Sequence, residues 1–191
     1  MVAEYVVAEM IPLFKILYVG PLGSGKTTNL KYIYSHLAPG DKSEFQVNLT
    51  ENGEVVSFEF RITYPLVSFL LLTVKGEHNF KRTRALLSER VDGLVFVADS
   101  DIERMEDNLI VLNELSDLGE LNKDRPFVFQ YNKRDLSNIA PVDKMEIALN
   151  EDQRLSIEAV ASEGLGVFKT QMSISKLITD KYCKGQHSGR S

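Results

Sequence analysis

The chain has 191 residues, of which 43% are hydrophobic and 26% charged, and its net charge is −5 at pH 7. This length fits one domain with its own core, and the acidic balance argues against partners such as nucleic acid or anionic membranes. One cysteine, Cys183, cannot form an internal disulfide, which favours a reducing compartment. No secretory signal, bilayer-spanning run or lipidation motif is evident, so we expect a cytoplasmic protein without a lipid anchor.

Strand and helix signals alternate along the chain. The runs 94–99 and 127–131 are continuously apolar, which is typical of parallel strands buried on both faces. Only a short turn separates the second predicted strand from the third, so these two must pair antiparallel. The pattern predicts an α/β fold: a six-stranded, mostly parallel sheet with one antiparallel strand and helices on both faces. We predict strands at 14–19, 55–63, 68–74, 94–99, 127–131 and 155–160, and helices at 26–36, 80–89, 102–118, 142–149 and 167–182.

Two further expectations concern the helices and the chain ends. In the predicted helix 102–118, Ile102, Met105, Leu109 and Leu112 recur at helical spacing, which predicts a stripe that faces the core. We assign residues 1–183 to a single domain and residues 184–191, which are small and polar, to a disordered tail or a remnant of expression.

Residues 20–27 fit the phosphate-loop pattern G-x-x-x-x-G-K-S/T at every position. A predicted strand leads into them and a predicted helix leads out, a context that a chance Gly-rich turn would lack. Glycines let backbone N–H groups surround phosphate oxygens, and the start of the helix adds its positive end. Lys26 would reach the β- and γ-phosphates, and the Thr27 hydroxyl would bind Mg²⁺. We assign nucleotide binding to Gly20, Leu22, Gly23, Ser24, Gly25, Lys26, Thr27 and Thr28.

A second motif, Asn132-Lys133-Arg134-Asp135, follows the apolar run 127–131 and matches N-K-x-D, with which GTPases read guanine. The Asp135 carboxylate can accept two N–H donors of guanine, at N1 and at the 2-amino group. Adenine lacks this donor pair, so the carboxylate would be left without partners. Asn132 would brace loops or contact the base edge, and the Lys133 stem would lie over the ring. Because ligands bind outside the carboxyl ends of such strands, both motifs belong to one site.

A third loop, residues 161–167, follows the last predicted strand. In small GTPases the loop at this position donates backbone N–H groups to the guanine oxygen. We assign that role to Val160 and Ala161. An ordinary loop that leads into a helix is the alternative interpretation.

With these motifs the chain resembles the bacterial MglA-type small Ras-like GTPases, a family of gliding motility and cell polarity. The resemblance is carried by residues 20–30, 91–106, 130–136, 159–161 and 164–168. It implies a Ras-like P-loop GTPase fold, with GTP or GDP and Mg²⁺ as ligands. It also implies a Roadblock-type activator, polarity or type IV pilus effectors that bind the switch face, and recruitment to a cell pole.

Departures from this family lie where GTP hydrolysis is controlled. The family's second switch reads Thr-Val-Pro-Gly-Gln, whereas residues 73–77 read Thr-Val-Lys-Gly-Glu. Gly76 keeps the position that contacts the γ-phosphate. Glu77 stands at the position of the catalytic Gln, and an ionised carboxylate cannot donate a hydrogen bond to that phosphate.

The first switch departs as well. An alignment on residues 58–60 puts Glu54 and Val55 at the family's Arg and Thr. Thr50 is an alternative ligand of Mg²⁺, if the loop follows a shifted path. An arginine finger alone contributes about 10³–10⁵ in rate, so we expect slow intrinsic hydrolysis.

These observations favour a guanine-nucleotide switch with weak hydrolysis. The alternative is a nucleotide-loaded interaction module, a pseudo-GTPase, that does not switch by hydrolysis. An ATP-dependent phosphotransferase is a third hypothesis, which the N-K-x-D motif disfavours. Effectors are expected to contact residues 51–60 and 75–84 in the GTP-loaded state, with Phe58 and Phe80 as test positions unless both are buried packing.

Overall fold

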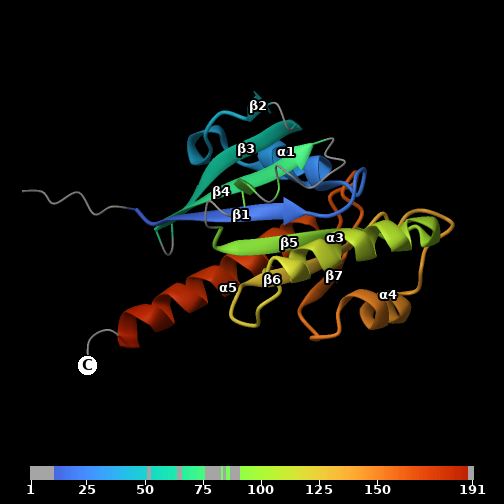
Figure 1. Cartoon of the computed structure of the whole chain (residues 1–191). Coiled ribbons are helices and arrows are strands. Elements are labelled where there is room, and N and C mark those ends of the chain that lie inside the picture. Colours follow the sequence, from blue (N-terminus) through green and yellow to red (C-terminus); the bar gives the residue numbers. More distant parts are fainter. Residues whose placement is uncertain are drawn as a thin grey trace, which may run out of the picture.

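The computed structural model describes residues 11–188 except 51–52, 64–65, 76–82, 84 and 87–90. Strands and helices alternate along it, as the apolar patterns predict (Figure 1). The strands are β1 (Leu13–Val19), β2 (Gln46–Thr50), β3 (Gly53–Ile62), β4 (Val67–Lys75), β5 (Gly93–Asp99), β6 (Phe127–Asn132) and β7 (Ser156–Glu158). The longer helices are α1 (Lys26–His36), α3 (Met105–Asp117), α4 (Val142–Leu149) and α5 (Val167–Ser188).

All of these strands join one sheet in the order β2-β3-β4-β1-β5-β6-β7. The pairs formed by β1, β4, β5, β6 and β7 are parallel, and β3 runs antiparallel to β4 as predicted. The predicted count of six strands is wrong, because β2 adds a seventh that pairs antiparallel with β3. Val47 and Leu49 of this edge strand are 52% and 79% exposed. The sequence of β2 therefore has no alternation of buried and exposed side chains from which a strand could be predicted.

Helices cover both faces of the sheet, with α3 in front of it and α1 behind it in Figure 1. The side chains of β5 alternate between two apolar clusters, as period-2 geometry requires. One cluster joins Leu94 and Phe96 to residues of α3 and α4, and the other joins Val95 to residues of α1 and α5. Every residue of β5 is buried, which confirms the prediction of a parallel strand buried on both faces.

The predicted helices 26–36 and 142–149 are confirmed at both ends. The predicted helix 102–118 is two elements: a short 3-10 helix, Ile102–Arg104, leads into α3. Ile102 is 52% exposed, so its expected place in the core is wrong. Of the predicted helix 80–89 the structure describes three residues, all helical: Thr83, Ala85 and Leu86.

The last helix, α5, continues through Ser188, beyond its predicted end at residue 182 and into the segment expected to be a tail. The rings of Tyr182 and Phe14 meet edge to face, with centroids 5.2 Å apart, and this contact joins α5 to β1. Among the described helices, none combines the length and the apolar character that a membrane span requires.

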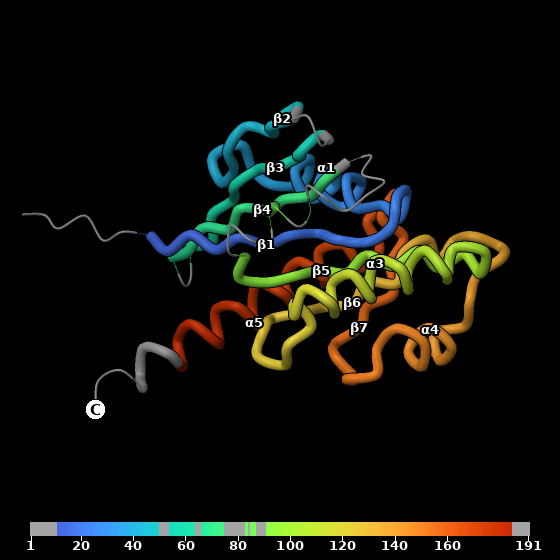
Figure 2. Tube along the Cα trace, in the orientation of Figure 1, coloured from blue at the N-terminus to red at the C-terminus, as the bar shows by residue number. Residues whose placement is uncertain are grey.

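The fold brings the carboxyl ends of β1, β5 and β6 to one end of the sheet, on the right in Figure 2. Asp99 at the end of β5 is in register with Asn132 at the end of β6. The phosphate loop follows β1 at the same end. The two sequence motifs therefore lie at the same end of the sheet, as predicted.

Candidate nucleotide-binding site

The phosphate loop has a backbone that only glycines accommodate at two of its positions. Gly20 and Gly25 have φ values of 142° and 102°. A Cβ on Gly20 would lie 2.2 Å from the Val97 carbonyl oxygen, and one on Gly25 would lie 2.1 Å from Asn132 Nδ2. The loop is thus pressed against β5 and the guanine motif, and the spacing of its glycines has a steric cause.

Lys26 and the start of α1 supply positive charge to this loop. Lys26 Nζ donates to the carbonyls of Gly20 and Pro21, each at 2.8 Å, which folds the ammonium group back along the loop. The first backbone N–H groups of a helix have no intrahelical acceptors, and the N-cap, Gly25, has no side chain to satisfy them. This arrangement suits an anion such as a phosphate group.

The remaining loop residues differ in what they can offer a ligand. Ser24 is fully buried, and its backbone N–H donates to the Pro21 carbonyl. Leu22 is 41% exposed at the tip of the loop. Thr27 is partly exposed next to Lys26, and its role as a Mg²⁺ ligand stays a prediction. A bound Mg²⁺ would offset the negative charge of the phosphates.

Asn132 is the point at which the three loops meet. Its side chain is 2% exposed. Nδ2 donates to the Ser24 carbonyl at 2.7 Å, and Oδ1 accepts from the Ala161 N–H at 2.9 Å. The phosphate loop, the guanine motif and the third loop are therefore held by one amide. Of the two roles predicted for Asn132, this structure shows the bracing of loops.

The third loop has a tight turn in which both predicted N–H donors have protein acceptors. The Val160 N–H donates to the Leu165 carbonyl at 3.0 Å, while the Ala161 N–H donates to Asn132. Donation to guanine by these two groups stays a prediction, and in this conformation each N–H would have to be shared or released.

Lys133 and Asp135 are the two residues predicted to contact the base. Lys133 has a φ of 65°, unusual for a residue with a Cβ. Its Nζ lies 2.6 Å from Oδ2 of Asp99, a carboxylate that is 1% exposed. Asp135 is exposed, and within the described part of the chain its carboxylate has no side-chain hydrogen bond or ion pair. That carboxylate is free to accept the two N–H groups of a guanine.

Sequence reasoning missed Asp99 and Arg104 as residues of this site. Arg104 Nη2 donates to the Leu22 carbonyl at 2.8 Å, and its Nε lies 4.0 Å from Asp99 Oδ2. Arg104 thereby connects the tip of the phosphate loop with the carboxylate that holds Lys133. The position of Asp99 at the carboxyl end of a buried strand was the available signal.

The structure places the expected first-switch residues inside the sheet. Glu54 and Val55 lie near the start of β3, in register with Lys75 and Val74 of β4. Val55 is 5% exposed and belongs to the apolar core. Phe58 is 1% exposed, so it is buried packing and cannot serve as a direct effector contact.

The remaining switch predictions concern Thr50, Gly76, Glu77 and Phe80. Thr50 lies at the end of β2, in register with Gly53. Gly76, Glu77 and Phe80 lie outside the described residues, so the predictions on them stay predictions.

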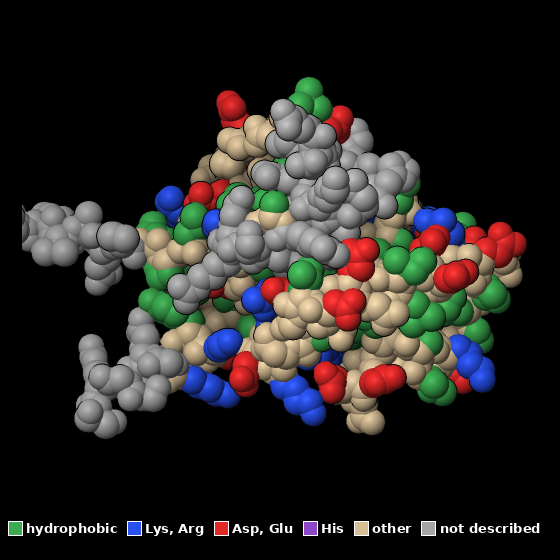
Figure 3. Space-filling view, in the orientation of Figure 1, with side chains coloured by type: hydrophobic (Ala, Val, Ile, Leu, Met, Phe, Trp, Pro, Cys, Tyr) green, Lys and Arg blue, Asp and Glu red, His purple; other side chains and the backbone are tan. Residues whose placement is uncertain are grey.

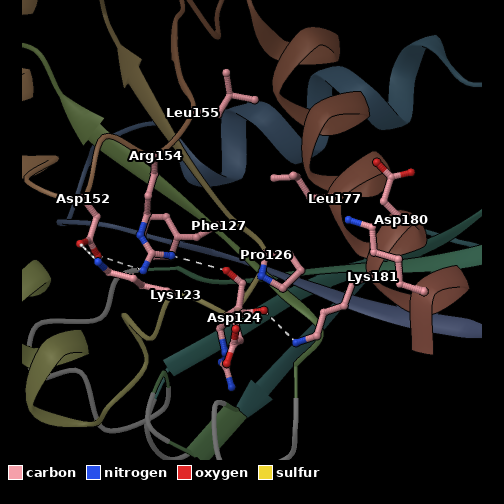
Figure 4. Close-up of a pocket in the computed structure, with 12 residues that line it drawn as sticks. Lys123, Asp124, Pro126, Phe127, Asp152, Arg154, Leu155, Leu177, Asp180 and Lys181 are labelled. Atoms are coloured by element: carbon pink, nitrogen blue, oxygen red, sulfur yellow. Dashed lines mark hydrogen bonds and ion pairs between the residues drawn. The ribbon is translucent and has the colours of Figure 1, made fainter. Parts of the chain in front are cut away.

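Away from this site, the surface is mixed in charge. Acidic and basic side chains are interspersed on the face that Figure 3 shows. A cavity of about 790 Å³ lies at the opposite end of the sheet, between the starts of β6 and β7 and the second half of α5 (Figure 4). Its cations have protein partners: Lys181 Nζ donates to the Asp124 carbonyl at 2.8 Å, and Arg154 Nη2 to that of Asn122 at 3.0 Å.

Fold and site together define a Ras-like small GTPase. The sequence matches the ADP-ribosylation factor family over residues 6–182, and the chain belongs to this family. It is 41% identical over 181 residues to Mutual gliding-motility protein MglA of Myxococcus xanthus (strain DK1622), a match that covers 90% of this chain and 93% of that protein. The predicted MglA-type resemblance is confirmed. Guanine nucleotides with Mg²⁺ are the ligands of this class of protein.

Proposed function

We propose that this chain is a guanine-nucleotide switch of the bacterial polarity and motility type, which binds GTP and GDP with Mg²⁺ and hydrolyses GTP slowly. One observation carries the proposal: Asn132 holds the phosphate loop, the guanine motif and the third loop together through hydrogen bonds of 2.7 and 2.9 Å. This contact supports a single site in which the start of α1 would bind phosphate and the exposed Asp135 carboxylate would accept from guanine. The 41% identity to the gliding-motility protein supports the cellular context.

The first experiment is to identify the nucleotide that purifies with the protein. The protein is denatured, and the released nucleotide is separated by ion-exchange chromatography. GTP or GDP near one equivalent is the expected result. Adenine nucleotides in its place, or preferential binding of ATP in a competition with GTP, would contradict the proposal and favour the phosphotransferase.

Hydrolysis is tested by single-turnover release of phosphate from GTP-loaded protein. We expect slow turnover, because Glu77 stands where the family has a Gln and Glu54 where it has an Arg. Glu77→Gln should give only a modest gain. A wild-type rate as fast as that of an activated GTPase, without any partner, would mean that another residue orients the water.

An interaction module without hydrolysis is the second candidate. Its supporting observation is that Val55, at the family's switch threonine, is buried in the core and cannot face a nucleotide in this conformation. Protein that keeps GTP intact for many hours, and whose partners bind the GTP and GDP forms equally, would favour this candidate over the switch.

Partners are proposed to be a Roadblock-type activator and polarity or type IV pilus effectors, with recruitment to a cell pole. Because Phe58 is buried, the better probe of the switch face is Leu49, which is 79% exposed on the edge strand β2. Leu49→Asp should weaken capture of a GTP-dependent effector, whereas Ile147→Asp on α4, at a residue that is 73% exposed, should not. Equal loss in both variants would argue against binding at the switch face.

A further inference from the structure

Three polar side chains lie inside the apolar layer between the sheet and helices α1 and α5, below the nucleotide loops. Asn29, Gln130 and Thr170 each have a relative exposure of 0%. They come from α1, β6 and α5 respectively, and that layer contains apolar residues such as Leu30 and Val128. Polar groups in such surroundings are costly unless they are hydrogen-bonded.

Their hydrogen bonds form a complete set. Gln130 Oε1 accepts from Asn29 Nδ2 at 2.7 Å, and Gln130 Nε2 donates to Asn29 Oδ1 at 2.9 Å. Gln130 Nε2 also donates to Thr170 Oγ1 at 2.9 Å, and that hydroxyl donates to the Gly166 carbonyl at 2.8 Å. Asn29 Nδ2 donates in addition to the Gly25 carbonyl at 3.0 Å. Since an amide nitrogen has two N–H donors, every donor of the three side chains is used.

The network ends on backbone carbonyls of the nucleotide loops. Gly25 joins the phosphate loop to α1, and Gly166 ends the third loop before α5. Gln130 lies two residues before Asn132, so both side chains point to the same face of β6. The same three segments are therefore tied twice: once by Asn132 at the site, and again by Gln130 in the layer beneath it.

We propose that Asn29 and Gln130, with Thr170, form a positioning network that couples the phosphate loop to the guanine-reading loops and thereby slows release of bound nucleotide. This inference rests on the proposed guanine-nucleotide binding. The stability of the fold does not by itself require these amides. Replacing both partners of a buried hydrogen bond with apolar groups of the same shape can leave the free energy of unfolding nearly unchanged. A directional pair fixes the relative position of α1 and β6, whereas two apolar side chains could slide.

The test compares nucleotide release with stability in near-isosteric variants. The double variant Asn29→Leu/Gln130→Met removes both amides together. Release of a fluorescent N-methylanthraniloyl GDP is followed after addition of excess GDP, and urea unfolding is followed in nucleotide-free protein. We expect at least tenfold faster release with an unfolding midpoint close to that of the wild type. Thr170→Val, which keeps the amide pair, should accelerate release by a smaller factor.

Gln171→Met serves as a matched control. Gln171 is also a buried amide, and its Nε2 donates to Ser175 Oγ at 2.9 Å within α5, without contact to either loop carbonyl. Its release rate should equal that of the wild type. Acceleration as large as in the double variant would overturn the inference.

Two further outcomes would overturn it. A double variant that keeps its midpoint and releases the GDP analogue at the wild-type rate would show that the pair only fills space. If the double variant does not fold, release from Thr170→Val at the wild-type rate has the same meaning. Wild-type protein that does not retain the GDP analogue would contradict the proposed function and this inference together, whereas the variant results contradict the network alone.

Discussion

The bracing amide of Asn132 can be tested by an almost isosteric change, Asn132→Asp. The acceptor for the Ala161 N–H is kept, but the donor 2.7 Å from the Ser24 carbonyl becomes a carboxylate oxygen that faces another oxygen. Removing one partner of a buried hydrogen bond costs about 1–3 kcal/mol. If the whole cost falls on the nucleotide-bound state, affinity drops roughly 5- to 150-fold, at 1.36 kcal/mol per factor of ten.

The effect of Asn132→Asp should also depend on pH. Burial raises the pKa of the introduced carboxyl group, and its protonated form again donates toward the Ser24 carbonyl. Release of a fluorescent GDP analogue should therefore be fast at pH 8 and slower at pH 6, relative to the wild type at each pH. Asn122→Asp is the matched control, because the exposed Asn122 amide also donates to a backbone carbonyl, that of Gly119 at 3.3 Å. If the Asn132→Asp variant released the GDP analogue at the wild-type rate at pH 8, the bracing role would be refuted.

Three other changes test the loops directly. Lys26→Ala should abolish measurable GTP and GDP binding in isothermal titration while circular dichroism shows an intact fold; unchanged affinity would remove the phosphate-loop assignment. Asp135→Asn should lose GTP and gain relative affinity for xanthosine triphosphate, whose 2-oxo group accepts a hydrogen bond, and unaltered base preference would mean that another group reads the base. Gly25→Ala should weaken nucleotide binding and lower the free energy of unfolding by about 1–3 kcal/mol. Residue 25 has a φ of 102°, and its Cβ would lie 2.1 Å from Asn132 Nδ2. If the variant were as stable in urea as the wild type, the loop would relax without cost.

The sheet could be predicted wherever burial leaves a pattern. The runs that form β5 and β6 are apolar at nearly every position because helices cover both faces, and their predicted ends are within one residue of those observed. The edge strand β2 escaped prediction since Val47 and Leu49 face solvent and only backbone pairing with β3 makes it a strand. Ile102 failed for a related reason: its spacing is helical, but a 3-10 turn rotates it out of the stripe.

The site could be predicted only where its chemistry is local in sequence. The phosphate loop and the N-K-x-D motif are short segments, so their residues and spacing could be recognised in the sequence. The contacts of Lys133 with Asp99 and of Arg104 with Leu22 join residues 34 and 82 positions apart. The pair Asn29–Gln130 spans 101 positions. Such pairs follow from the order of the strands in the sheet, and no sequence motif predicts them.

The position of Val55 bears on the proposed slow hydrolysis, because residue 55 aligns with the threonine of the family's first switch. A hydroxyl at this position would lie in the core beside Val74 and other apolar residues, because Val55 is 5% exposed and paired within the sheet. Burying a hydroxyl without a partner costs about 1–3 kcal/mol. In this conformation a threonine at residue 55 would be packed in the apolar core, so we expect it to lower stability without acting as a metal ligand.

We therefore expect Glu54→Arg/Glu77→Gln to raise the single-turnover rate above that of Glu77→Gln alone. Adding Val55→Thr should lower the free energy of unfolding by about 1–3 kcal/mol and give no further gain in rate. Urea unfolding and phosphate release, measured on the same preparations, separate the two effects. A triple variant that is both faster than the double variant and equally stable would show that the start of β3 leaves the sheet when GTP is bound, and that residue 55 then faces the nucleotide.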